Sequence, residues 1–278
     1  MVKQVYINSN PVSVDGQRYL VSVSTTQPTI EQAKYNRGGY DGVSFTSPFY
    51  RNDAFSIKVL VFNPDPNVVQ AATDSLFGLL RLDPNKDKQQ YVNLDFVLAD
   101  NSVRSCRAYF KGQTAENKPN SNGKREILLQ FESDSFYLKS NERTISIVDV
   151  QMGGMAVPMG VPMSMAHEAQ IGIESIYNFG NTFAYPILTL TGPTDDAFSI
   201  VNATTREVMT YTEVLTASQT VTIDSYQHTV LLNGAVNKYD KLTGNMWVID
   251  AGVNRIAIGG GEVLPAATVT FYDAWLGV

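Results

Sequence analysis

Short segments of alternating apolar residues, each closed by turn-forming residues, recur along the last hundred residues of the chain. Apolar residues at every second position place one face of a strand in a core, and turn residues roughly every 8–12 positions are typical of an antiparallel sandwich. These features predict a C-terminal β-sandwich that presents surfaces and performs no chemistry. The four segments are Ala184-Tyr-Pro-Ile-Leu-Thr-Leu-Thr-Gly-Pro193, Val221-Thr-Ile-Asp-Ser225, Val230-Leu-Leu-Asn-Gly234 and Trp247-Val-Ile-Asp-Ala-Gly-Val-Asn254.

Strands are also expected through most of the N-terminal half. Residues 55–62 alternate most clearly and place Phe55, Ile57, Val59 and Val61 on one face. Two polar stretches interrupt the pattern and are predicted to be long loops, over residues 28–42 and 112–124. The other expected strands cover residues 2–8, 18–24, 91–98, 103–111, 127–138 and 144–150, and then 171–179, 185–191, 198–203, 207–213, 220–223, 228–232, 247–249, 254–258 and 268–274.

One helix is expected between these strands. It follows Asn67, the predicted N-cap, and ends before Asp83-Pro84, with Arg81 in the last turn, where a cation suits the helix dipole. Its apolar residues share one face at helical spacing and are Val68, Val69, Ala72, Leu76, Leu79 and Leu80.

Residues 151–170 differ from both halves in composition. They contain five of the eight methionines together with glycines and prolines, which sustain neither a helix nor a strand. An interdomain linker is favoured, and a Met-rich adaptable contact surface is the alternative. In either case we expect an N-terminal domain over 1–150, a linker over 151–170 and a C-terminal domain over 171–278, since 278 residues suffice for two cores.

The charge balance bears on the possible partners. The net charge is −6, and no run of Lys or Arg occurs, which argues against sequence-specific nucleic-acid binding. Charged residues make up 17% of the chain, below the roughly 25% of typical soluble domains, which suggests a surface partly covered by neighbours. Cys106 is the only cysteine, so no intramolecular disulfide forms. The N-terminus has no signal-peptide pattern and no stretch approaches ~18 apolar residues, so we expect a soluble product of a cytoplasm without membrane insertion.

A calcium-like segment, Asp83-Pro-Asn-Lys-Asp87, does not complete its pattern. Lys88 occupies the position that needs glycine, and Leu94 occupies that of the bidentate glutamate. A polar loop is therefore expected there. Two histidines and one cysteine, widely separated, cannot build a zinc site, so no metal or cofactor is expected.

Asp224, Ser225 and His228 are the residue types of a catalytic triad. They lie at the entrance of a strand, where successive side chains alternate in direction, so an aspartate that caps its own turn is favoured. Residues 259–261 are all glycine but do not lead from a strand into a helix, as a phosphate-binding loop would. Asn202 begins a glycosylation sequon, which has no use without export. No catalytic residue is predicted, and the chain is not expected to be an enzyme.

Taken in order, the four segments and the closing Val269-Thr-Phe-Tyr-Asp-Ala-Trp-Leu276 resemble the siphophage distal tail (Dit) proteins, over roughly residues 171–278. The N-terminal half is similar more loosely, through residues 128–137. Ala251 stands where the family often has proline. The resemblance implies structural roles for the motif residues Tyr185, Pro186, Gly192, Asp224, Asn233, Gly234, Trp247, Gly252, Asn254 and Trp275.

What the resemblance implies is a mainly β chain, with a tail-tube-like N-terminal β-sandwich carrying one α-helix and a galectin-like C-terminal antiparallel β-sandwich. Such proteins form a hexameric ring in the phage tail tip and join the major tail protein of the tube to the tail-tip (Tal) protein. DNA passes through the ring, and the C-terminal domain can carry receptor-binding or other baseplate proteins. The resemblance places this chain in the virion, after synthesis in the host cytoplasm.

The alternative function is that the C-terminal sandwich is a carbohydrate-binding module for a host cell-wall saccharide. His167 and His228 are the only histidines, so a galectin-type His–Asn–Arg–Trp–Glu site is not recoverable. A chain of 278 residues also leaves no room for an inserted carbohydrate module.

Overall fold

The computed structural model divides the chain into two compact units. The first contains residues 1–140 and 275–278, and the second contains residues 141–274. The chain leaves the first unit within β12 (Leu138–Ile147) and returns to it at the end of β22 (Ala266–Trp275). The predicted domain ranges stay predictions, and the predicted linker 151–170 lies outside the described residues. The structure describes residues 2–25, 30–31, 34–36, 43–45, 49–50, 54–80, 91–120, 123–147 and 171–277.

The N-terminal unit is built on one antiparallel sheet. Its strands are β1 (Val2–Ile7), β2 (Asn10–Pro11), β3 (Arg18–Thr25), β8 (Ala54–Phe62), β9 (Tyr91–Leu98), β10 (Val103–Asn120) and β11 (Lys124–Ser133). They are paired in the order β2-β1-β9-β10-β11-β8-β3. Between β3 and β8 the chain forms two nested antiparallel pairs, β4 (Ile30–Glu31) with β7 (Phe49–Tyr50) and β5 (Lys34–Asn36) with β6 (Val43–Phe45).

The predicted alternation over residues 55–62 is confirmed, because Phe55, Ile57, Val59 and Val61 are all buried on the core face of β8. The predicted loop over 112–124 is wrong for most of its length. β10 continues to Asn120 and pairs with β11, since backbone hydrogen bonding extends a ladder whatever the polarity of the side chains. The predicted loop over 28–42 contains the short strands β4 and β5.

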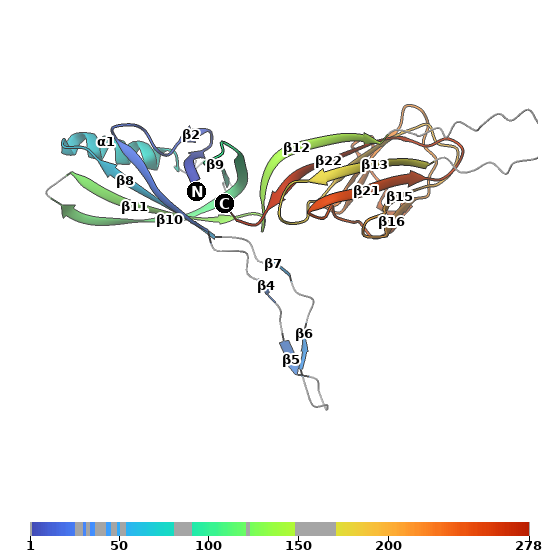
Figure 1. The fold of residues 1–278 in the computed structure, drawn as a ribbon, viewed down its shortest axis with the longest axis horizontal. Coiled ribbons are helices and arrows are strands. Elements are labelled where there is room, and N and C mark those ends of the chain that lie inside the picture. Colours follow the sequence, from blue (N-terminus) through green and yellow to red (C-terminus); the bar gives the residue numbers. More distant parts are fainter. Residues whose placement is uncertain are drawn as a thin grey trace, which may run out of the picture. The chain divides into compact units, whose positions relative to one another are not determined.

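The helix α1 (Pro66–Gly78) packs on the core of this unit (Figure 1). Its buried face carries Val69, Ala72 and Leu76, as the spacing predicted. The predicted N-cap Asn67 is wrong, because Asp65 is the cap and its carboxylate accepts the N–H of Asn67 at 2.9 Å. Pro66 explains the difference, since a proline at the first helical position has the required φ and lacks the N–H that would be unpaired there. Arg81 and Asp83 lie outside the described residues.

The C-terminal unit is a sandwich of two antiparallel sheets. One sheet has the order β19-β18-β17-β14-β22-β12, and the other has the order β13-β21-β15-β16-β20. Figure 1 labels β12 and β22 of the first sheet and β13, β21, β15 and β16 of the second. The strands not yet bounded are β13 (Ile171–Asn178), β14 (Ile187–Thr191), β15 (Phe198–Asn202), β16 (Glu207–Tyr211), β17 (Thr220–Asp224), β18 (Thr229–Leu232), β19 (Val236–Asn237), β20 (Leu242–Gly244) and β21 (Gly252–Gly259), and a 3-10 helix covers Tyr239–Lys241.

Alternating side chains from both sheets fill the core of the sandwich. Leu188, Leu190 and Val221 point inward from one sheet, and Ile200 and Ile256 point inward from the other. The predicted hairpin of residues 198–203 with 207–213 is confirmed by the pairing of β15 with β16. The predicted strand 247–249 is wrong, because this segment makes only the isolated bridge Ala184↔Ile249. The predicted fold class, mainly β with one α-helix, is confirmed for the described part of the chain.

The observed cap gives a test of the helix start. We expect Asp65→Ala to lower the free energy of unfolding by about 1 kcal/mol, because one N–H of the first turn loses its acceptor. Asn67→Ala, the control, is expected to change it by less than about 0.5 kcal/mol. Urea unfolding followed by circular dichroism measures both, and the reverse order of effects would show that the helix begins at Asn67.

Candidate functional site

The residues that could carry chemistry do not cluster in the described part of the chain. No group of three or more His, Cys, Asp or Glu side chains there could hold a metal ion. None of the helices described is both long and apolar enough to span a membrane. The calcium-like segment 83–87 lies outside the described residues. What the structure does bring together is a network of buried polar side chains at one end of the C-terminal sandwich.

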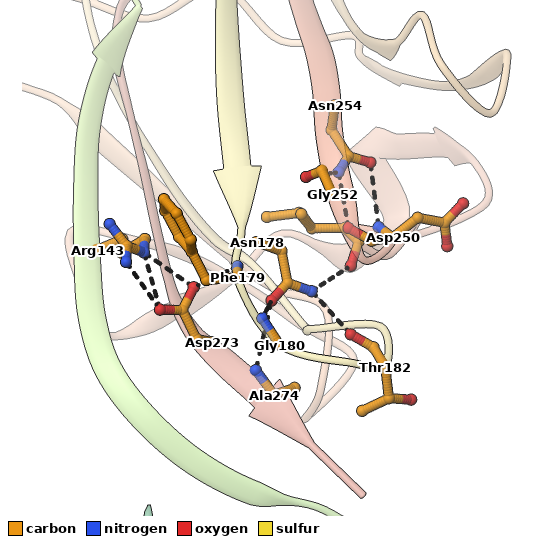
Figure 2. A network of polar contacts seen from close by, with 11 residues as sticks. Arg143, Asn178, Phe179, Gly180, Thr182, Asp250, Gly252, Asn254, Asp273 and Ala274 are labelled. Carbon is orange, nitrogen blue, oxygen red and sulfur yellow. Dashed lines mark hydrogen bonds and ion pairs between the residues drawn. The ribbon is translucent and has the colours of Figure 1, made fainter. Parts of the chain in front are cut away.

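Asn178 is the centre of this network (Figure 2). Its side chain, fully buried at the end of β13, donates to the carbonyl oxygen of Thr182 at 2.8 Å and to that of Ile249 at 3.3 Å. Its amide oxygen accepts the N–H groups of Gly180 at 2.9 Å and Ala274 at 3.4 Å. One side chain therefore satisfies backbone groups from three separate segments, which would otherwise be buried without partners.

Gly180 is required by the same arrangement. The carbonyl oxygen of Ala274 accepts the N–H groups of Asn181 at 3.0 Å and Thr182 at 3.3 Å, so the two segments lie against each other. A Cβ at position 180 would collide with that carbonyl oxygen. The loop after β13 therefore fits only with a glycine there.

Arg143 and Asp273 form the charged part of the network (Figure 2). The Asp273 carboxylate, whose side chain is 3% exposed, accepts two bonds from Nε of Arg143, at 2.8 and 3.0 Å, and one from Nη2 at 2.9 Å. It also accepts the N–H of Phe179 at 3.0 Å, and the Arg143 guanidinium lies 4.2 Å from the centre of the Phe179 ring. The bonds to Asp273 raise the pKa of the guanidinium. This pair joins β12 to β22 close to the first and last residues of the unit, 141 and 274.

Asn254 is buried and fixes the turn that precedes β21. Its amide oxygen accepts the N–H of Asp250 at 3.0 Å, and its Nδ2 donates to the carbonyl oxygens of Asp250 at 2.8 Å and Gly252 at 3.3 Å. Gly252 adopts φ +92°, which favours glycine. Asn202, also buried, donates to the carbonyl oxygen of Val248 at 3.0 Å, so the residue that begins the sequon is part of the core.

Asp224 caps its own turn, as the sequence predicted. Its carboxylate accepts the N–H groups of Tyr226 at 2.8 Å and Gln227 at 2.9 Å. The N–H of Ser225 donates to the carbonyl oxygen of Pro186 at 3.1 Å. Tyr185 packs edge-on against Tyr226, with ring centres 5.2 Å apart, and burial raises the pKa of Tyr185.

Asn233 and Gly234 form the predicted hairpin turn between β18 and β19. Their φ angles are +49° and +70°, and the Asn233 amide oxygen accepts the N–H of Thr220 at 2.9 Å. At position 192 close packing, and not a positive φ, requires a glycine, since a Cβ there would collide with the carbonyl oxygen of Thr216.

The residues that follow glycines 259–261 bind a side chain of the protein itself. The Asp195 carboxylate accepts the N–H groups of Glu262 at 3.0 Å and Val263 at 2.9 Å. The bond from Val263 is the main reason why the pKa of Asp195 is lowered. A Cβ on Gly261 would collide with this carboxylate, which accounts for a glycine there.

The two tryptophans belong to different units. Trp247 is 1% exposed in the core of the C-terminal unit. Trp275 packs against the core of the N-terminal unit, and the Arg104 guanidinium lies 4.0 Å from the centre of its ring. Nη1 of Arg104 also donates to the carbonyl oxygen of Gly277 at 2.9 Å, which holds the last described residues in place.

Sequence reasoning missed the roles of Asn178, Arg143 and Asp273. Arg143 and Asp273 are 130 positions apart, so no local pattern connects them. Asn178 had one available signal, because a polar amide closes an alternating strand just before Gly180. The ten motif residues do not meet at one place: Asn254 and Gly252 share a turn, Tyr185, Pro186 and Asp224 surround another, and Trp275 lies in the other unit.

Comparison with known proteins agrees with this arrangement. Residues 179–275 match the family described as siphovirus-type tail component, C-terminal domain. The resemblance to the siphophage distal tail proteins is confirmed. The fold of nearly the whole chain is also that of a distal tail protein. The crystal structure of the Dit protein (gp 19.1) of phage SPP1 superposes with a TM-score of 0.66 at 12% identity, covering 98% of this chain and 99% of that one. That protein is described as a paradigm of the hub of the adsorption apparatus in phages that infect Gram-positive bacteria.

A structure of the phage P2 baseplate in its activated conformation also matches, with a TM-score of 0.40 at 10% identity, covering 94% of this chain and 99% of that one. No curated protein matches the chain significantly. The distal tail resemblance therefore rests on the C-terminal family match and on the fold shared with the SPP1 protein.

The buried charge pair of this Dit-like chain can be tested directly. Arg143→Met leaves the Asp273 carboxylate buried without its counter-ion, and we expect a loss of about 3 kcal/mol of unfolding free energy. The control Lys58→Met breaks an ion pair whose side chains are both about half exposed, with an expected loss below about 1 kcal/mol. Urea unfolding measures both losses. For Arg143→Met it is followed by the fluorescence of Trp247 in a Trp275→Phe background, and for Lys58→Met it is followed by circular dichroism. Equal losses would contradict a structural role for the pair.

The amide of Asn178 gives a second test. In Asn178→Asp an oxygen replaces the group that donates to Thr182 and Ile249, so buried acceptors face each other, and we expect a loss of about 3 kcal/mol. In Asn233→Asp the accepting oxygen is retained at an exposed turn, and we expect a change within about 0.5 kcal/mol. Thermal unfolding of both variants is the measurement; a tolerated Asn178→Asp would argue against the network.

Proposed function

We propose that the chain is a structural protein of the phage tail tip that forms a hexameric ring, joins the tail tube to the baseplate or tail-tip protein, and lets DNA pass. The observation that carries this proposal is the match of residues 179–275 to the tail-component family. The shared fold of nearly the full chain with the SPP1 hub protein supports it. The role is mechanical, and no enzymatic step is part of it.

The N-terminal unit offers surfaces for ring formation. Among the described strands, β3 is the last in the order of its sheet, so one of its edges has no partner strand. A strand or loop of a neighbouring subunit can pair with that edge. The nested pairs β4–β7 and β5–β6 follow directly after β3 in sequence. Head-to-tail contacts between such surfaces generate a ring when the rotation between subunits closes.

The solvent face of the N-terminal sheet suits the wall of a channel for DNA. Lysines and glutamates on this face pair with each other, as Lys58 does with Glu126 at 2.7 Å and Lys111 with Glu132 at 2.8 Å. Lysines paired in this way are less available to phosphates, and the chain as a whole carries a charge of −6. Weak phosphate contacts would let DNA slide through without a sequence-specific grip.

The C-terminal unit is the proposed attachment surface for receptor-binding or other baseplate proteins. A row of aliphatic residues crosses the solvent face of its second sheet through the pairs Ile173↔Ala257, Val201↔Ala257 and Val201↔Val208. Ile173 and Val208 are exposed. Protein partners cover exposed aliphatic surface of this kind. The major tail protein and the tail-tip (Tal) protein are the proposed partners of the ring, and the virion is the proposed location.

The ring can be weighed in solution. We expect native mass spectrometry of the purified chain to give a main species of six times 30.6 kDa, because the closed ring satisfies every subunit interface. Obligate interfaces of this class bury roughly 2,000 Å² or more, so the species should persist at low micromolar concentration. A monomer as the only species at high concentration would contradict the proposal.

A further inference from the structure

The strand β13 has one edge without a partner strand in the described part of the chain. It stands at the end of the order β13-β21-β15-β16-β20. All eight of its residues, Ile171–Asn178, pair with β21 without a shift of register. Natural edge strands are commonly protected by a bulge, a proline or a lysine, and β13 contains none of these. A long and regular edge of this kind is a template for a further strand.

The solvent face of β13 is apolar at two positions and small at the position between them. Ile173 and Tyr177 are 43% and 45% exposed, and Ser175, which is also exposed, lies between them on the same face. On β21, Ala257 is paired with Ile173 and Val253 is paired with Tyr177. A strand added to this edge would place its alternate side chains beside Ile173, Ser175 and Tyr177.

Contacts within the unit hold the Tyr177 side chain. Its ring lies against that of Phe179, with ring centres 4.2 Å apart. Phe179 in turn lies against the Arg143 guanidinium, and its N–H donates to the Asp273 carboxylate (Figure 2). Because the aromatic pair is positioned before a partner arrives, less entropy is lost on binding.

Arg255 is the one charged residue on the solvent face of β13, β21 and β15. It is exposed and is paired with Ser175, and its guanidinium has no hydrogen-bond or ion-pair partner among the described residues. An added strand would lie two strand spacings from β21, roughly 10 Å, and only the short side chain of Ser175 stands between. An arginine and an acidic side chain together span that distance. The charge therefore favours a carboxylate on the added strand, opposite Ser175.

A second copy of β13 does not supply that carboxylate. Two copies paired through this edge would bring together only the residues at positions 173, 175 and 177 on the solvent face, and none of these is acidic. Both Arg255 guanidinium groups would then be left without a counter-ion. A different protein is the occupant that the charge favours.

We propose that the β13 edge binds an extended segment of another protein as an added strand, in which an acidic residue lies between two apolar residues at alternate positions. The acidic residue meets Arg255, and the apolar residues cover Ile173 and Tyr177. This pattern is the same in both directions, so it holds for a parallel and for an antiparallel strand. The inference rests on the proposed attachment role of the C-terminal unit, and it names the chemistry of the segment that attaches.

Selection from a peptide library by the full chain tests the inference. The library is a threonine-rich sequence with random residues at alternate positions, since threonine favours extended structure. We expect the wild type to select Asp or Glu between two aliphatic or aromatic residues. Arg255→Glu should select Lys or Arg at the central position, because the charge of the face is reversed. A selected acidic peptide should bind the wild type about tenfold or more tightly than Arg255→Glu, and less tightly at high salt.

Two further variants complete the comparison. Tyr177→Ser should lose the apolar preference at one end of the peptide, because the ring that covers this position has gone. The matched control, Lys241→Glu, reverses a charge in the 3-10 helix that precedes β20, at the other end of the sheet order, and should select as the wild type does. Thermal unfolding of each variant establishes that it is folded.

The outcomes separate this inference from the proposed ring. The same central preference in Arg255→Glu as in the wild type would overturn it, and so would the absence of any selected peptide, as when the edge is covered within the chain itself. Binding of a cell-wall saccharide that Tyr177→Ser abolishes, without peptide selection, would assign the face to a sugar instead. A six-fold assembly that selects no peptide would overturn this inference alone, and a monomer that selects acidic peptides would contradict only the ring.

Discussion

The C-terminal sandwich depends on satisfying the backbone polar groups of the segments that join its strands. These segments contain buried residues such as Thr182 and Ile249, whose backbone N–H and C=O groups need partners. Asn178, Asn202 and Asn254 supply them, with amide groups that can donate and accept at once. The carboxylate of Asp273 adds an acceptor for Phe179 and holds Arg143. The motif residues on which the resemblance was based include only Asn254 of these four, so the network is wider than those motifs.

Two aspartates of the C-terminal unit also use their carboxylates to hold backbone groups of loops. Asp224, which has a triad residue type, accepts two N–H groups of its own turn, and Asp195 accepts the N–H groups of Glu262 and Val263. Side chains held in this way stabilise loops, and the loops in turn define the surface that the unit presents.

Local patterns in the sequence predicted the parts of the fold that local physics determines. The alternation from Phe55 to Val61 and the hairpin of β15 with β16 depend on residues close in sequence, and both were correct. The end of β10 was missed because its extension depends on β11, whose side chains do not reveal it. Arg143 and Asp273 could not be predicted, since their pairing arises only when β12 and β22 come together.

We propose above that this chain assembles into a ring with a passage for DNA. Electron microscopy of the purified full-length protein tests it most directly, because class averages report both symmetry and the central opening. The account predicts particles with six-fold symmetry and a central hole wide enough for a DNA duplex. Single compact particles without rings at micromolar concentration, or rings closed at the centre, would contradict it.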